Sequence, residues 1–416
     1  MVSKLAQNLI GSEIIKIGNQ VNELKAQGAE IANLTIGDLN STVYPIPQQL
    51  KDGIVKAYQE NLTNYPPANG LLSVRKSVAN DLKNRWDLDY SPDDILIAAG
   101  SRPLIYATFK CLVDEGDKVI YPVPSWNNNH YAYLTSAQKI EVEVKPENRF
   151  LPTAEDLREH LSGATLLALC SPLNPTGTMY TKEQLSAICE LVIEENKKRG
   201  KHEKPLYIMY DQIYAMLTFD AEHYNPVSLY PELKDYTIFI DGISKCFAAT
   251  GVRVGWGFGP AKVIDRMKAF LTHVGAWAPK PEQQATAEFL EKTEEVNTFV
   301  NDFKGKIQTS LNTLHAGIQD LKQKGLWVDS IQPMGAMYLT VKLDYIGKTM
   351  PNGKKIENSS DLVFYLIEEA GVALVPFSAF GNNPKMPWFR ASVGGCSLSD
   401  IKNMMPRLET ALAKIK

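Results

Sequence analysis

The chain has 416 residues, of which 44% are apolar and 22% charged, a composition that suits a globular protein of about two domains. Its formal net charge of −3 argues against a surface that binds nucleic acid or an anionic membrane. The sequence has no continuous run of about 18 apolar residues and no signal-peptide pattern. Its five cysteines form no C-x-x-C pair, so we expect no metal site, no disulfide framework and a cytoplasmic location.

The middle of the chain alternates two kinds of segment. After a helix-like stretch over residues 11–27 and a proline-rich arm, short apolar runs alternate with helix-like ones. Apolar runs without strict alternation are typical of strands buried on both faces, and strand–helix alternation favours an α/β domain with a mostly parallel sheet. The predicted strands are 94–100, 117–124, 165–172, 206–211, 237–244 and 254–259, and the predicted helices include 102–113, 181–198 and 261–273.

A helical pattern dominates residues 283–324, where apolar side chains from Val300 to Leu321 recur every three or four positions and Gly325 is placed to end the helix. Such a helix is long enough to connect two domains. An apolar segment (335–344), a helix-like stretch (360–370) and a further apolar segment (371–381) then indicate a smaller α+β unit. We therefore predict a large domain over residues 46–300 and a small domain built from residues 1–45 and 301–416.

Five polar segments follow the predicted strands, where open α/β sheets bind their ligands. In A-A-G-S-R-P-L, Ser101 is a predicted N-cap, and the free N–H groups of a helix that begins near Arg102 can hold a phosphate. In P-S-W-N-N-N-H, Trp126 can stack on an aromatic ring. Taken alone, the first motif is more often a plain helix cap and the second a packing tryptophan.

The next two segments place an amide and a carboxylate at strand ends. Asn174 lies in the rigid turn S-P-L-N-P-T-G. Asp211, in Y-D-Q-I-Y, ends a strongly apolar strand, where a carboxylate is costly unless it is paired or hydrogen-bonded. A protonated pyridine nitrogen would suit it, whereas a helix N-cap is the simpler alternative. Tyr214 follows three residues later.

The fifth segment, G-I-S-K-C-F-A-A-T-G-V-R-V-G-W-G, carries Ser244 and Lys245 at a predicted strand end and Arg253 eight residues later. Burial lowers the pKa of a lysine and frees its amine as a nucleophile. A serine and an arginine at this spacing can bind a phosphate by charge-assisted hydrogen bonds. A lysine at a strand end is more often exposed, but small residues and glycines surround this one.

Together the five segments resemble the class I/II aminotransferases, which are fold-type I enzymes dependent on pyridoxal 5′-phosphate (PLP). The similarity runs from N-L-T-I-G-D-L-N (33–40) to W-F-R-A-S-V-G-G (388–395), and its most specific motif is S-K followed by G-x-R-x-G. The resemblance implies a large domain with a mostly parallel seven-stranded sheet between helices, and a smaller α+β domain.

The resemblance also implies roles for individual residues. Lys245 would bind PLP as a Schiff base and move the substrate proton, Asp211 would pair with the pyridine nitrogen, and Tyr214 would act with Asn174 on the phenolic oxygen. The remaining expected cofactor-binding residues are Gly100, Ser101, Arg102, Trp126, Ser244, Arg253 and, from the partner subunit of a homodimer, Tyr65. The expected substrate-binding residues are Gly37, Trp126, Asn174 and Arg390, the last as the clamp for the α-carboxylate.

Two positions are unusual for the family that the chain resembles. Gly242 stands where a serine or threonine is common, so one phosphate contact is missing or comes from Ser244. Arg102 follows Ser101 where small residues are common. We group Arg102 with the cofactor-binding residues. Two alternatives stay open: its side chain contacts an acidic substrate side chain, or it is solvated or ion-paired.

The predicted function is transfer of an amino group from an L-amino acid, with a lean towards the aspartate type, to a 2-oxo acid such as 2-oxoglutarate by a ping-pong mechanism. A C–S β-lyase or related PLP chemistry on the same fold is the alternative. A transcription regulator with this domain would need a helix-turn-helix module ahead of residue 35 and a basic face, and we expect neither.

Overall fold

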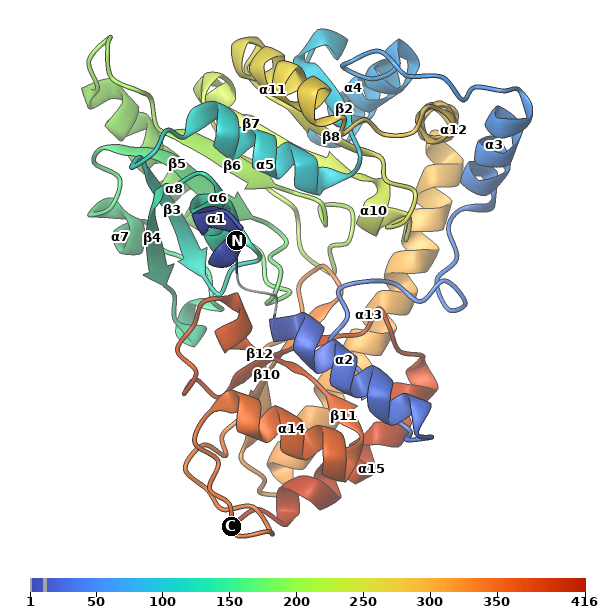
Figure 1. Ribbon diagram of the computed structural model, residues 1–416, viewed down its shortest axis with the longest axis vertical. Coiled ribbons are helices and arrows are strands. Elements are labelled where there is room, and N and C mark those ends of the chain that lie inside the picture. The colour runs from blue at the N-terminus through green and yellow to red at the C-terminus, as the bar shows by residue number, and fades with distance from the viewer. Residues whose placement is uncertain (1, 10–12) are drawn as a thin grey trace.

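The computed structural model describes residues 2–9 and 13–416, and its larger part is built on a seven-stranded sheet (Figure 1). The strand order is β2-β8-β7-β6-β5-β3-β4, and β8 alone runs antiparallel to its neighbours. This confirms the predicted α/β fold with a mostly parallel sheet. The strands are β2 (Ile95–Ala98), β3 (Lys118–Val123), β4 (Gln138–Glu143), β5 (Ala164–Cys170), β6 (Tyr207–Asp211), β7 (Thr237–Gly242) and β8 (Gly255–Phe258).

Buried apolar side chains cover the sheet on both faces. Side chains of α5 (Ser101–Leu112) and α11 (Ala261–Val274) pack on one face, and those of α4 (Leu72–Trp86) and α8 (Lys182–Lys198) on the other. Burial on both faces explains why most strands read as continuous apolar runs. The edge strand β4 was not predicted, because its sequence QKIEVE is largely exposed and offers no such run.

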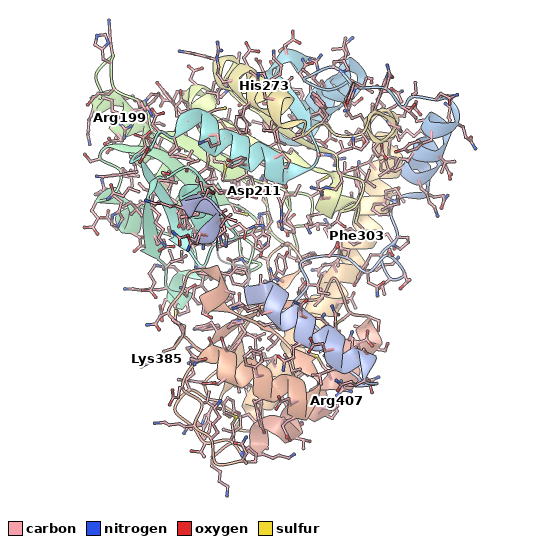
Figure 2. All side chains as sticks on the ribbon, viewed as in Figure 1. Arg199, Asp211, His273, Phe303, Lys385 and Arg407 are labelled. Carbon is pink, nitrogen blue, oxygen red and sulfur yellow. The ribbon has the colours of Figure 1, made fainter. Side chains whose placement is uncertain are left out.

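The helical pattern expected over residues 283–324 is two helices, α12 (Lys280–Leu290) and α13 (Thr293–Gln323), with a break at Glu291 and Lys292. α13 connects the two parts of the molecule, as Figure 1 shows. Val296 and Val300 pack in the core of the sheet, whereas the side chains from Phe303 to Leu321 belong to the core of the smaller part. Figure 2 shows Phe303 on α13 where the two parts meet.

The smaller part is α+β, as predicted. Its four-stranded antiparallel sheet has the order β12-β13-β10-β9 and packs with α14 (Ser359–Ala370) and α15 (Leu398–Ala413). The N-terminal segment joins it, because β1 (Ala32–Asn33) pairs with β11 (Val372–Ala373). The strands of the sheet are β9 (Val328–Ser330), β10 (Tyr338–Leu343), β12 (Val375–Pro376) and β13 (Trp388–Ser392).

The helix expected over residues 11–27 is α2 (Glu13–Ala26), and residues 11 and 12 lie outside the described residues. A short helix, α1 (Lys4–Gln7), precedes it. The domain boundaries at 45/46 and 300/301 stay a prediction. Tyr44 and Leu50 do lie in different cores, but the core of the smaller part also includes Tyr214 and Leu217 from the loop after β6.

Candidate active site

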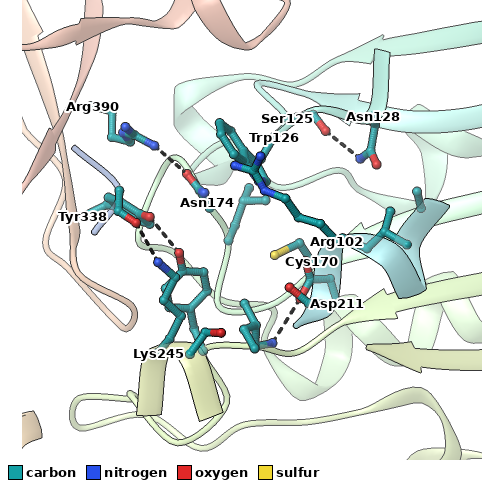
Figure 3. A pocket seen from close by; sticks show the side chains of 18 of the residues that line it. Arg102, Ser125, Trp126, Asn128, Cys170, Asn174, Asp211, Lys245, Tyr338 and Arg390 are labelled. Carbon is teal, nitrogen blue, oxygen red and sulfur yellow. Dashed lines mark hydrogen bonds between the residues drawn. The ribbon is translucent and has the colours of Figure 1, made fainter. Parts of the chain in front are cut away.

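The largest set of predicted site residues meets in one pocket between the two parts of the molecule (Figure 3). The seven-stranded sheet contributes the loops after β2, β3, β5, β6 and β7, the smaller part contributes β10 and β13, and the N-terminal segment contributes residues 36–38. Eleven of the predicted residues line this pocket: Gly37, Ser101, Arg102, Trp126, Asn174, Asp211, Tyr214, Ser244, Lys245, Arg253 and Arg390. Gly100 and Tyr65 are not among its lining residues.

Lys245 lies on α10 (Ile243–Cys246), a single helical turn after β7, and not at the strand end that the sequence predicted. Its Nζ donates a hydrogen bond to the Gly37 carbonyl oxygen at 2.6 Å. Burial lowers the pKa of Lys245 to about 8; Asp38 opposes this shift, and three nearby arginines add to it. At pH 7 about a tenth of this amine is therefore uncharged, and the uncharged form is the one that acts as a nucleophile and a general base.

Asp211 is the last residue of β6, and Figure 2 shows it in the interior near α5. Its Oδ1 accepts a hydrogen bond from the Ile213 backbone N–H at 3.1 Å. Burial raises the pKa of Asp211 to about 6, against the opposing charge of Lys245. Asp211 is not a helix N-cap, since the next helix is α9 (Pro226–Leu229). A cationic ring nitrogen would therefore stabilise the charged carboxylate.

Arg390, on β13, is almost completely buried (1% exposed) between the rings of Tyr338 and Phe380, at 4.8 and 4.9 Å from its guanidinium carbon. One terminal nitrogen donates to Asn174 Oδ1 at 3.1 Å and the other to the Thr35 carbonyl oxygen at 2.6 Å. Within the described chain its Nε has no hydrogen-bond partner, and no carboxylate forms an ion pair with it. A buried, uncompensated guanidinium fits an anionic ligand.

Tyr214 and Asn174 lie in the pocket, but their polar atoms bind other protein groups. The Tyr214 hydroxyl shares a hydrogen bond of 2.7 Å with that of Tyr338, and Asn174 binds Arg390. Tyr338 was not identified from the sequence, because it stands in the apolar strand β10, where an aromatic residue predicts only packing. Asp38, Cys170 and Thr250 also line the pocket without a sequence signal.

The phosphate-binding segment differs from prediction at its cap. Gly100, with φ 82°, is the N-cap of α5, and Ser101 is the first helical residue. A side chain at Gly100 would collide with the guanidinium of Arg253, which donates to the Ala99 and Thr250 carbonyl oxygens at 2.8 Å. The helix N-terminus and Arg253 thus converge, and no carboxylate of the described residues is paired with Arg253, as a phosphate group would require.

Gly242 has a structural reason to lack a side chain. A Cβ built there would lie 2.7 Å from Gly255 Cα and 2.9 Å from the Val254 carbonyl oxygen, because β7 and β8 approach closely at this point. The serine or threonine expected by resemblance cannot be accommodated without moving β8. Ser244 lines the pocket instead.

At the mouth of the pocket, the guanidinium carbon of Arg102 lies 5.1 Å from the centre of the Trp126 ring. Figure 3 shows the Arg102 side chain extending from α5 towards Trp126. No carboxylate in the described ranges 2–9 and 13–416 forms an ion pair with Arg102. Tyr65 lies elsewhere: it is 82% exposed and packs edge-on against Trp277 at 5.3 Å.

This arrangement fits PLP: a partly neutral lysine suits the aldehyde, a buried carboxylate suits the ring nitrogen, and an arginine beside a helix N-terminus suits the phosphate. When bound, PLP supplies an electron sink for charge developing at the substrate Cα. Among the described side chains no group of three His, Cys, Asp or Glu could hold a metal ion, and no described helix is long and apolar enough to cross a membrane.

Known sequences are similar over almost the whole chain. The family profile described as aminotransferase class I and II matches residues 29–408. The chain is 29% identical over 420 residues to a probable aspartate/prephenate aminotransferase of Rickettsia felis, covering 100% of this chain and 97% of the relative. It is also 29% identical over 391 residues to an aspartate aminotransferase of Bacillus subtilis, covering 92% of each.

Solved structures agree in fold. The aspartate aminotransferase from Rhizobium meliloti superposes with a TM-score of 0.91 at 24% identity over 100% of both chains. The Thermus thermophilus aspartate aminotransferase with maleate superposes with a TM-score of 0.87 at 25% identity, covering 99% of this chain and 100% of that structure. Since the family profile spans every pocket segment from Gly37 to Arg390, the chain belongs to the class I and II aminotransferase family and is a PLP-dependent aminotransferase.

Proposed function

We propose that the protein transfers the amino group of an aspartate-type L-amino acid to a 2-oxo acid such as 2-oxoglutarate by a ping-pong mechanism. The observation that carries the choice of substrate is the pair of arginines in one pocket, Arg390 inside and Arg102 at the mouth, neither with a carboxylate partner in the described chain. A dicarboxylic substrate can satisfy both. The two relatives above, one named a probable aspartate/prephenate aminotransferase and the other an aspartate aminotransferase, support this choice, as does the Thermus structure with the dicarboxylate maleate.

In this proposal Arg390 binds the α-carboxylate through its fork of N–H groups, and Asn174 keeps that fork in place. Arg102 binds the side-chain carboxylate. Its guanidinium lies over Trp126 and points away from the start of α5, which favours contact with substrate over contact with the cofactor phosphate.

Lys245 removes the substrate Cα proton at its Nζ and later returns it as a general acid. Its pKa of about 8 favours both removal and return of the proton near neutral pH. Asp211 keeps the cofactor's ring nitrogen protonated, and Tyr214 acts with Asn174 on the phenolic oxygen. Ser101, Ser244, Arg253 and the N-terminus of α5 hold the phosphate, and Trp126 stacks on the ring.

We also propose a cytoplasmic homodimer in which Tyr65 reaches the phosphate in the partner's pocket. Tyr65 is highly exposed on its own chain and lies outside the pocket that Lys245 lines, and all five cysteines are free. The proposed large and small domains keep the boundaries 46–300 and 1–45 with 301–416.

A panel of amino donors tests the proposal, with 2-oxoglutarate as acceptor and each donor also assayed without acceptor. We expect aspartate to give the highest kcat/KM and turnover to require an acceptor. Steady release of pyruvate and ammonia without an acceptor would instead show β-lyase chemistry. A clear preference for aromatic or aliphatic donors would refute the role of Arg102.

A further inference from the structure

Behind the pocket, on the opposite face of the seven-stranded sheet, lies a buried carboxyl that the reaction outlined above does not use. Asp241 is the penultimate residue of β7 and is 6% exposed. Its neighbour Ile240 packs with α5 and α11 on the pocket side, whereas Phe239 packs with α4 and α8 on the far side. Because strand side chains alternate, Asp241 shares the far face with Phe239.

The Asp241 carboxyl binds two strand ends at once. One oxygen accepts a hydrogen bond from the side-chain amide of Gln212 at 3.1 Å, and Gln212, fully buried, directly follows Asp211. The other oxygen accepts from the backbone N–H of Gly242 at 2.7 Å. Gly242 opens the helical turn that carries Lys245.

We propose that Asp241 is a positioning residue of the amino-transfer reaction: from the far face of the sheet, its carboxyl fixes the strand end that carries Asp211 relative to the turn that carries Lys245. Asp211 and Lys245 would both hold the cofactor, so the distance between them would decide whether its ring nitrogen and its aldehyde carbon can be engaged together. This inference rests on the roles proposed above for Lys245 and Asp211.

The charges around Asp241 indicate its ionisation state. α4 presents Asp81 and Arg85, which form an ion pair of 2.6 Å, β6 contributes Asp211, and α10 contributes the thiol of Cys246. Arg85 pairs with Asp81, and no cation among the described residues forms an ion pair with Asp241. Burial, reinforced by the charges of Asp81 and Asp211, raises the pKa of Asp241 to about 8. Asp241 therefore holds a proton at neutral pH, which spares the interior a second negative charge behind Asp211.

The experiment compares cofactor-loaded enzymes that lose different parts of this arrangement. Asp241→Ala loses both links, Gln212→Ala loses only the link to β6, and Asp241→Asn keeps an oxygen for Gly242. The double exchange Asp241→Asn with Gln212→Glu reverses donor and acceptor and should restore the link. Asp81→Asn is the matched control, because it removes a partly buried carboxyl of the same region that binds neither strand end.

We expect Asp241→Ala and Gln212→Ala to lower kcat and weaken PLP binding by about tenfold with KM changed less, and to shift the pH midpoint of the cofactor's colour change. Asp241→Asn keeps only the link to Gly242 and should lose about as much as Gln212→Ala, the double exchange should approach wild type, and Asp81→Asn should leave kcat and the colour midpoint unchanged. The proposal would be overturned if both alanine variants kept the wild-type kcat, PLP affinity and colour midpoint. It would also be overturned if Asp81→Asn showed the same losses as the alanine variants.

A second measurement uses cofactor-free protein and does not depend on turnover. Because the folded-state pKa of Asp241 is raised, its contribution to stability is greatest below about pH 4 and declines as the pH rises to about 8. The unfolding temperature of Asp241→Asn should therefore exceed that of wild type increasingly over this range. An equal or lower temperature at pH 8 would overturn the assigned proton. If Lys245→Ala stayed fully active, the proposed function itself would fail, which separates the two outcomes.

Discussion

Arg390 inside the pocket and Arg102 at its mouth carry the same charge in different surroundings. Arg390 is buried between two aromatic rings and held by Asn174 and Thr35, whereas Arg102 is exposed and contacts the Trp126 ring. Lys245 and Asp211 line the same pocket as Arg390, and burial shifts the pKa values of both. The comparison indicates that residues inside the pocket serve the reaction itself, whereas the residue at its mouth serves the choice of substrate.

The most severe way to disrupt the interior is Lys245→Ala. We expect kcat to fall by at least about 10⁴-fold, because the general base and the covalent cofactor link are both lost. Single-turnover assays with aspartate measure the effect. Lys268→Ala, a partly exposed lysine paired with Asp265, is the control and should retain wild-type activity. Comparable activity in the two variants would contradict the account.

Arg390→Lys keeps the charge and removes the planar fork. We expect kcat/KM to fall by about 10²-fold for every amino donor, since all share the α-carboxylate that the fork binds. An equal loss for every donor would distinguish Arg390 from Arg102, whose loss is expected for acidic donors alone. A loss confined to acidic donors would mean that the two arginines have been assigned to the wrong ends of the substrate.

Asp211→Asn tests the interior through pH. Burial raises the pKa of Asp211 to about 6 in the cofactor-free protein, so its charge costs stability as the pH rises from about 4 to about 6. Above pH 6 we expect cofactor-free Asp211→Asn to be more stable to unfolding by about 2–3 kcal/mol, with no difference below pH 4. Denaturant unfolding at several pH values measures this. Equal stability at pH 7 would indicate that Asp211 is not desolvated.

Arg102→Gln changes the mouth and leaves the interior intact. We expect kcat/KM to fall about tenfold for aspartate and to change little for alanine, because only the side-chain carboxylate loses its partner. A donor panel under identical conditions reports the ratio. Equal losses for the two donors would instead assign Arg102 to the cofactor phosphate.

The smallest expected effect is that of Tyr65→Phe, which removes one exposed hydroxyl outside the pocket of its own chain. We expect PLP to bind about fivefold more weakly, the value of one hydrogen bond, with the dimer retained. Equilibrium binding and sedimentation measure the two quantities. Tyr58→Phe, whose hydroxyl binds Glu282 in the same groove, is the control and should bind PLP like wild type. Equal weakening in both variants would contradict a specific role for Tyr65.

The sequence allowed prediction of those features that depend on local residue pattern and chemistry. Buried strands such as β6 read as apolar runs, and Asp211 is conspicuous because a carboxylate ends such a run. The half-exposed edge strand β4 and the break between α12 and α13 carry no comparable signal. Tyr338 and Asp241 could not be predicted, because their roles depend on which strands become neighbours and which face each side chain takes.

The central claim is that Lys245 carries the cofactor. The most direct test is to identify the residue to which PLP is covalently attached. Purified protein loaded with PLP is reduced with borohydride, digested and mapped by mass spectrometry. The account predicts one modified peptide, with the added mass on Lys245, and none in Lys245→Ala. Modification at any other lysine, or protein that binds no PLP, would contradict it.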